Sequence, residues 1–226
     1  MLEERLQAEE LMDDPALPEE DYVAAMRDLA AVNRLTLAYR PTLQFLARAA
    51  QNRSDLKVLD VGFGDGDMLR QVRRFLNQRQ VENTLVGIDL NPRSLAAARA
   101  KPSDGIEWRI GDYAELAGEG WDCVISSLVA HHMSREQLLA FLRFMEAEAR
   151  VGWFVNDLHR HGFAFHGYPL LARLMGWHPI VRQDGRTSIA RSYRPAEWPP
   201  LLAEAGVDGA RVFRAFPFRL CVEKVR

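Results

Sequence analysis

Cysteine is scarce in this chain. Only Cys123 and Cys221 occur among 226 residues, and each lies inside an apolar run typical of a strand. These positions argue against a disulfide framework and indicate buried, reduced thiols. No run of 18 apolar residues is present, which argues against a transmembrane helix, and the acidic N-terminus lacks the basic and apolar regions of a signal peptide. We therefore expect a soluble, cytoplasmic protein without a membrane span.

An excess of positive charge is also missing. The formal net charge is −2 and the sequence pI about 6.3, which provides no field to gather nucleic acid or an anionic membrane. The length of 226 residues and the 48% hydrophobic content suit one α/β domain with an appendage. We expect a small-molecule substrate, no nucleic-acid partner, and a monomer or homodimer.

Apolar periodicity divides the chain into three parts. Residues 1–53 have helical spacing, and we expect them to form an N-terminal helical lid. In the remainder, 54–226, five strand-like runs alternate with helix-like runs up to about residue 158, which predicts a mostly parallel sheet with helices on both faces. The alternation lapses over 159–192, where we expect a helical insertion on the substrate side. Ligands of such sheets bind beyond the carboxyl ends of the strands.

The glycine-rich stretch VLDVGFGDGDML, residues 58–69, lacks the residues that usually hold phosphates. The third glycine of a dinucleotide loop is replaced by Asp67, and no lysine follows Gly66 as in a phosphate-binding loop. Asp60, Asp65 and Asp67 would moreover repel a pyrophosphate. The loop therefore favours a ligand that carries positive charge.

Two further carboxylates follow predicted strands. Asp89 ends the second strand, where it can accept from both hydroxyls of a ribose, and Asp112 ends the third, where it can accept from a purine amine. Together with the glycine loop they indicate a nucleoside without phosphates but with an ammonium group. S-adenosylmethionine has these parts.

Four motifs, VLDVGFGDG, VGIDLNPRSLAAAR, IGDYAEL and WDCVISSLVAHHM, resemble those of the class I S-adenosylmethionine-dependent methyltransferases in order and spacing. The resemblance extends over roughly residues 40–226. It implies a doubly wound sheet of seven strands in the order 3-2-1-4-5-7-6, with the last strand antiparallel. It also implies S-adenosyl-L-methionine as cofactor and S-adenosyl-L-homocysteine as product.

The same resemblance assigns roles to individual residues. Gly62 and Gly64 would line the methionine end of the cofactor, and Asp60 would support its ammonium group. The remaining cofactor contacts that it implies are Asp89 at the ribose, Leu90 on the adenine, Asp112 and the backbone of Tyr113 at the adenine amine, and Ser126 near the sulfonium.

No histidine precedes residue 131, and all six lie between 131 and 178. His131 and His132 follow the fourth strand, and His159 follows the fifth, so all three are candidates for a general base at the sheet edge. For His132 a buried structural role is an equal alternative. We expect no metal, because the HH and HRH pairs lack the spacing of a zinc site. A divalent cation near Asn156 and Asp157, as in catechol-type enzymes, is the alternative.

On the substrate side, the aromatic block after the fifth strand is similar to that of small bacterial methyltransferases of secondary metabolism. Arg160 fits a partly anionic aromatic substrate, and by analogy Tyr39 and Arg40 would lie near the cofactor. We predict O-methylation of a phenolic or polyketide-like acceptor with histidine-assisted deprotonation. C-methylation of a quinone-like ring, an RNA or protein substrate, and a non-catalytic cofactor-binding partner are the alternatives.

Overall fold

A seven-stranded sheet forms the centre of the computed structural model, which describes residues 2–226. Its order, β3-β2-β1-β4-β5-β7-β6, is the predicted one. Strands β1 to β5 pair in parallel, whereas β7 is antiparallel to both β5 and β6, as predicted. The strands are β1 (Asp55–Val61), β2 (Glu82–Asp89), β3 (Ile106–Ile110), β4 (Cys123–Ser127), β5 (Gly152–Leu158), β6 (Arg211–Ala215) and β7 (Arg219–Val225).

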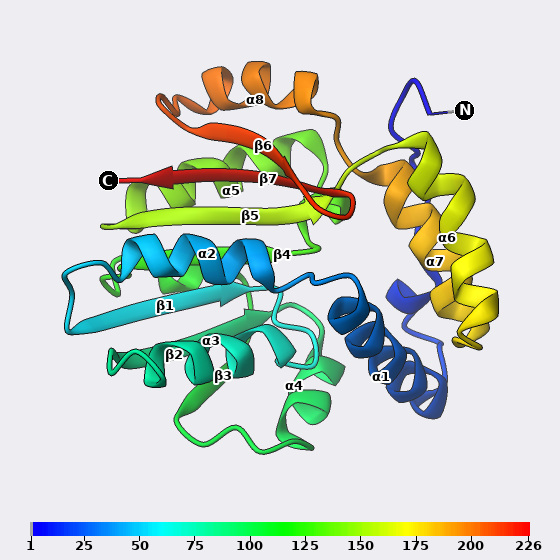
Figure 1. Ribbon diagram of the computed structural model, residues 1–226, viewed down its shortest axis with the longest axis horizontal. Helices are drawn as coiled ribbons and strands as arrows, with labels where there is room; N and C mark the ends of the chain where they lie inside the picture. The colour runs from blue at the N-terminus through cyan, green and yellow to red at the C-terminus, as the bar shows by residue number, and fades with distance from the viewer. Residues whose placement is uncertain (1) are drawn as a thin grey trace.

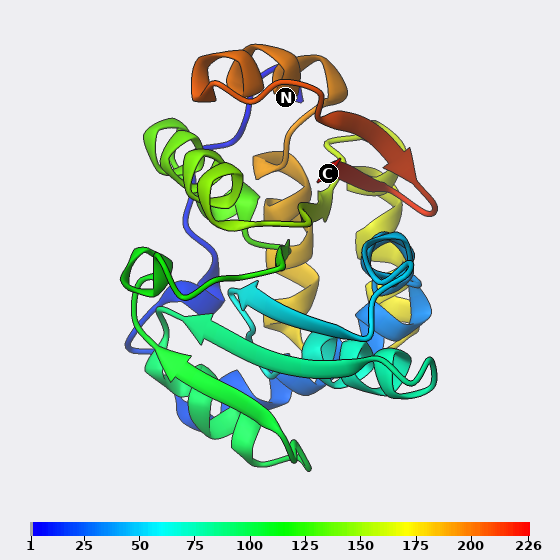
Figure 2. The same cartoon turned by 90° about the vertical axis from the view of Figure 1, so that its left-hand side faces the viewer.

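Helices cover both faces of the sheet. On one face α2 (Arg40–Ala49) and α3 (Asp67–Asn77) bury Phe45, Leu46 and Leu69 against the strands. On the other face α5 (Arg135–Glu148) and α8 (Trp198–Ala205) bury a second apolar core. Figure 2 shows α5 on the opposite side of the sheet from α2 and α3. The fold is therefore doubly wound, as predicted.

Three further helices lie beyond the carboxyl ends of the parallel strands. They are α1 (Glu19–Leu35), α6 (Gly162–Leu174) and α7 (Pro179–Arg191). In Figure 1 the arrowheads of β1 and β5 point toward these helices. Because ligands of parallel sheets bind at this edge, α1, α6 and α7 are placed to enclose one.

The remaining elements are short. They are α4 (Pro92–Arg99) and the 3-10 turns η1 (Leu11–Asp13), η2 (Tyr113–Leu116), η3 (Ala130–His132) and η4 (Pro195–Glu197). α8 begins at Trp198, so Pro199 and Pro200 lie in its first turn, where a proline costs no helical hydrogen bond.

The division of the chain at residue 53 stays a prediction. α2 packs in the core of the sheet, where Phe45 stacks on Phe154 with ring centroids 5.1 Å apart. α1 packs instead on α7. Among residues 2–226, no helix combines the length and the apolar character that crossing a bilayer requires.

Candidate functional site

A cavity of about 1180 Å³ opens at the carboxyl ends of the strands. Its walls come from the loops after β1, β2 and β4, from α1, α6 and α7, and from the N-terminal segment around Glu10 and Asp13. The parallel register brings the strand ends together, because Val61 pairs with Ile88 on one side and with Ser126 on the other.

The glycine loop after β1 forms the floor of the cavity. Gly62 and Gly64, both at its wall, have φ values of +79° and +57°, a region that favours glycine. A Cβ added at Gly62 would lie 2.3 Å from Cγ2 of Val129, which follows β4. Glycine at 62 thus allows the loops after β1 and β4 to approach each other closely.

Asp60 supplies a carboxyl group without a partner. Its side chain is fully buried, borders the cavity, and leaves Oδ1 without a hydrogen bond to any residue in the range 2–226. Burial, with the negative charges of Asp67 and Asp89, raises the pKa of Asp60 well above its usual value. A buried carboxyl group of this kind fits a ligand that brings positive charge.

Asp89 links the loops after β1 and β2. Its two carboxylate oxygens accept from the backbone N–H groups of Gly64, at 2.9 Å, and Asn91, at 2.8 Å. Burial raises the pKa of Asp89 despite these bonds. Leu90, 73% exposed, borders the cavity beside it, so both predicted cofactor residues lie at the expected edge.

Asp112 and Ser126, the residues predicted to bind the cofactor after β3 and in β4, do not border the cavity. Tyr113 borders the cavity, but the Asp112 carboxylate caps η2 by accepting from the Ala114 N–H at 2.9 Å. Asp112 is exposed and does not border the cavity. Ser126 is buried in β4, one residue before the wall residue Ser127, and its Oγ has no partner within the described chain.

His131 and Asp157 form a buried pair at the cavity wall. The carboxylate of Asp157 accepts from Nδ1 of His131 at 2.6 Å and from the His131 backbone N–H at 2.8 Å. Burial by itself lowers the pKa of the imidazole, but Asp157 and Glu10 raise it to about 9. With Nδ1 held by Asp157, Nε2 is the ring nitrogen left for a ligand, as in general-base histidines.

Glu10 brings the N-terminal segment onto this pair. One oxygen of its buried carboxylate lies 3.5 Å from Nε2 of His131, and the other lies 3.8 Å from Nε2 of His132. Burial favours a raised pKa of Glu10, but hydrogen bonding and charge from His131 and His132 lower it. Ser188 donates to Glu10 at 2.8 Å, and Arg191 lies 3.7 Å from it.

Glu10, His131 and His132 could also hold a metal ion. Their candidate ligand atoms lie within 4.8 Å of one another, and two imidazoles with one carboxylate suit a divalent transition metal. The adjacent cation of Arg191, 3.7 Å from the Glu10 carboxylate, opposes a metal here. The sequence reasoning missed Glu10, since no motif connects it to residues 121 positions away.

His159 and Arg160 lie away from the cavity wall. The backbone N–H of His159 donates to Phe218, and burial together with nearby cations lowers the pKa of its ring. The guanidinium of Arg160 is fully buried and donates to the carbonyls of Leu2, Glu3 and Ser192 and to the Glu197 carboxylate. The structure therefore does not bring these two residues together with His131.

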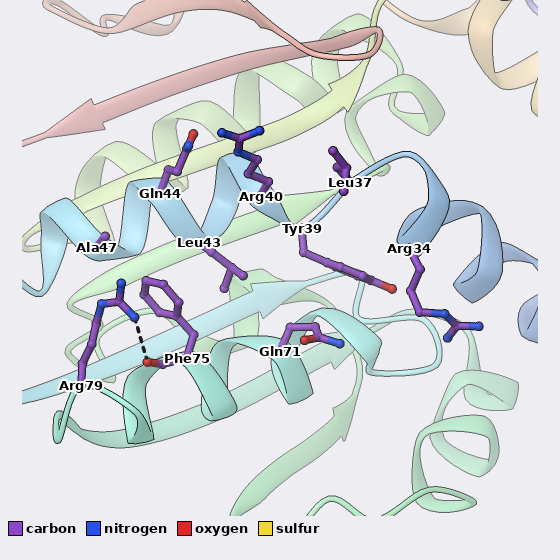
Figure 3. A pocket seen from close by; sticks show the side chains of 10 residues that line it. All are labelled: Arg34, Leu37, Tyr39, Arg40, Leu43, Gln44, Ala47, Gln71, Phe75 and Arg79. Atoms are coloured by element: carbon purple, nitrogen blue, oxygen red, sulfur yellow. Dashed lines mark hydrogen bonds between the residues drawn. The ribbon is translucent and has the colours of Figure 1, made fainter.

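Tyr39 and Arg40 point to different places. The Tyr39 hydroxyl donates to Asp67 at 2.5 Å, and Tyr39 borders the cavity. Arg40 borders a separate hollow of about 510 Å³ lined by α2, α3 and the end of α1. Figure 3 shows the guanidinium of Arg40 and the ring of Tyr39 pointing in different directions. Tyr39 is thus the one placed near the glycine loop.

Residues 58–151 match a protein family described as a methyltransferase domain. None of the curated proteins matches the chain. Among solved structures, the plantazolicin methyltransferase BamL, in complex with a triazolic desmethylPZN analog and SAH, is 16% identical, with a TM-score of 0.64. The match covers 87% of this chain and 71% of BamL.

Two other solved structures have the same fold. A SAM dependent methyltransferase from Aquifex aeolicus is 17% identical, with a TM-score of 0.61; the match covers 89% of this chain and 96% of that one. Magnesium protoporphyrin IX methyltransferase (ChlM) from Synechocystis PCC 6803, with bound SAH, is 19% identical, with a TM-score of 0.56. That match covers 84% of this chain and 83% of ChlM.

Proposed function

Because the chain carries a class I S-adenosylmethionine-dependent methyltransferase domain, we propose that it methylates the hydroxyl oxygen of a small phenolic or polyketide-like acceptor. The observation that carries this proposal is His131, which is held by the buried Asp157 and borders the same cavity as the glycine loop. Phenols must lose a proton to become good nucleophiles, and a histidine held by a carboxylate is suited to accept it.

The residues at the floor of the cavity fit the cofactor. The unpartnered carboxyl group of Asp60 would bind its ammonium group, and the Gly62–Gly64 backbone would line its methionine end. Asp89 would hold the ribose, and Leu90 would pack on the adenine. When bound, S-adenosylmethionine supplies a sulfonium-activated methyl group and leaves as S-adenosylhomocysteine, its sulfur keeping the electron pair of the broken carbon–sulfur bond.

His131 would remove the proton of the acceptor hydroxyl at Nε2. Its pKa of about 9 lies close to that of a phenol, about 10, so the proton transfer is nearly balanced in free energy. Asp157 keeps the remaining proton on Nδ1 and fixes the orientation of the ring. Glu10 faces the same nitrogen from the other side, so the acceptor hydroxyl has to replace the Glu10 carboxylate there.

The test combines binding with turnover. S-adenosylmethionine should bind wild type in a calorimetric titration more tightly than NADH, and a phenol panel should give a product heavier by one methyl group. His131→Asn should lose most of the turnover while keeping the cofactor affinity, and His159→Asn, at a histidine that does not border the cavity, is the matched control. Turnover by His131→Asn at the wild-type rate would refute the base assignment.

Carbon methylation is the second candidate. His131 would deprotonate a phenol in the same way, and the ring carbon beside the oxygen would then take the methyl group. That carbon would lose its hydrogen as a proton and the oxygen would take one up, which restores the aromatic phenol. NMR of the product distinguishes the two, since an O-methyl and a ring C-methyl group resonate at different positions. A product methylated only on carbon would overturn O-methylation and leave the role of His131 intact.

A further inference from the structure

The helix α6 presents an unpartnered apolar face to the cavity. Phe163, Leu170 and Leu174 are 71%, 73% and 82% exposed, although all three border the cavity. With Gly167 between them, their spacing of four, three and four residues places them on one side of the helix. Large apolar side chains gathered in this way mark a surface that an apolar ligand covers.

This face is continuous with the rest of the site. The Phe163 ring stacks on Phe218, which follows β6, with centroids 5.7 Å apart, and both residues border the cavity. Met26 and Leu29 of α1 border the same cavity. Apolar side chains of α6 and α1 therefore border the same cavity as His131.

Charge divides the cavity into two ends. Glu10, Asp13, His131, His132 and Arg191 cluster where the N-terminal segment meets the sheet edge. Within the described residues 2–226, no charged residue of α6 borders the cavity. One end thus suits a polar head group, and the other suits hydrocarbon.

The volume of the cavity exceeds that of a pocket for a single ligand. Pockets for one drug-sized ligand occupy roughly 300–1,000 Å³, and this cavity of about 1180 Å³ has to hold the cofactor and the acceptor together. Since its α6 side is open to solvent, a long chain can extend along the helix beyond the enclosed part.

We propose that the acceptor is an amphiphile, with a phenolic head group at His131 and a hydrocarbon tail along Phe163, Leu170 and Leu174 of α6. This inference rests on the proposed function for the head group, whereas the tail site rests on α6 itself. Each methylene moved from water onto an apolar protein surface strengthens binding by up to about fourfold.

The experiment measures the affinity of 4-alkylphenols with one to nine tail carbons for the protein saturated with S-adenosylhomocysteine. Calorimetry should show Kd falling by about two- to fourfold per added CH2 and then reaching a plateau. The 1-alkanols of the same lengths, which lack the phenol, should show a parallel dependence. In turnover, KM should follow the same trend.

Leu170→Glu tests the assignment to α6. The residue is 73% exposed, so the fold tolerates the change. The variant should reduce the ratio of the Kd values for one-carbon and nine-carbon phenols by about tenfold or more. Val23→Glu is the matched control, because Val23 is 53% exposed on α1 and does not border the cavity. It should leave that ratio unchanged.

Each outcome separates the two proposals. Chain-length dependence without methylation would refute the proposed acceptor chemistry and support the tail site. Methylation with a Kd independent of chain length, or no binding of either series, would overturn the tail site. The wild-type protein could instead sediment with anionic lipid vesicles, with Leu170→Glu abolishing this and phenol binding independent of chain length. That result would assign the α6 face to a membrane surface and would also overturn the tail site.

Discussion

Replacing Asp157 by asparagine removes the negative charge that holds His131. The carboxylate accepts from both Nδ1 and the backbone N–H of this histidine, and both side chains are fully buried. Raising the pKa of the imidazole from 6.5 to about 9 corresponds to about 3 kcal/mol in favour of the protonated form. Burial leaves little solvent screening to reduce this value.

In Asp157→Asn, the pKa of His131 should fall to its ordinary value of 6.5 or below. Burial still disfavours the charged ring, and Glu10, 3.5 Å from Nε2, only partly offsets it. An NMR titration of the imidazole signals measures this directly. The pH at which kcat/KM reaches half its maximum should move in the same direction, and the rate in wild type should rise with pH through about 9.

The same substitution changes how stability depends on pH. Because the pKa of His131 is higher in the folded state, the protonated ring stabilises the fold. This contribution is complete below about pH 6.5 and is lost as the pH rises through about 9. In denaturant unfolding at pH 6, the free energy of unfolding of Asp157→Asn should be about 3 kcal/mol lower than that of wild type. The difference should be smaller at pH 9.5.

Asp13→Asn is the control for this experiment. Asp13 accepts from His132, at 3.2 Å, rather than from His131, and its loss should leave the pKa of His131 near 9. A wild-type His131 that titrates near 6.5 would refute the reasoning. So would a pKa that stays near 9 in Asp157→Asn.

Three other substitutions test separate parts of the site. Asp60→Asn should weaken S-adenosylmethionine binding by about ten- to a hundredfold. Since burial raises the pKa of Asp60, wild-type affinity should fall as the pH falls, and calorimetry of the variant should show no such dependence. Gly62→Ala should lower the free energy of unfolding in urea by about 2 kcal/mol, because the added Cβ meets Val129. Gly118→Ala is the control, since Gly118 has a similar φ of +78° but open space around it, and it should cost less. Equal losses in the two variants would refute the clash. Arg160→Ala should lower the free energy of unfolding by about 3 kcal/mol while leaving cofactor affinity unchanged. A loss of cofactor affinity with unchanged stability would instead indicate that Arg160 belongs to the binding site.

Local patterns in the sequence predicted the strand and helix positions. Strand and helix periodicity identified the five parallel strands, and the glycine-rich stretch marked the loop after the first of them, where Gly62, Gly64 and Gly66 all have positive φ values. Such signals are readable because they depend on residues within a few positions of one another. The order of the strands and the roles at their ends came from the resemblance to a family.

The arrangement around His131 was decided by the tertiary structure. The strand-end rule placed His131, His132 and His159 at the same sheet edge, yet the structure buries His131 on Asp157, leaves His132 partly exposed and keeps His159 off the cavity wall. Which way a side chain points after a strand depends on the path of the following turn, and this path has no signature of its own. Glu10 reaches His131 only because α7 and the turn after β4 provide a surface for the N-terminal segment. Contacts across more than a hundred residues form through packing, so sequence alone determined the components of the site, and the fold determined which of them meet.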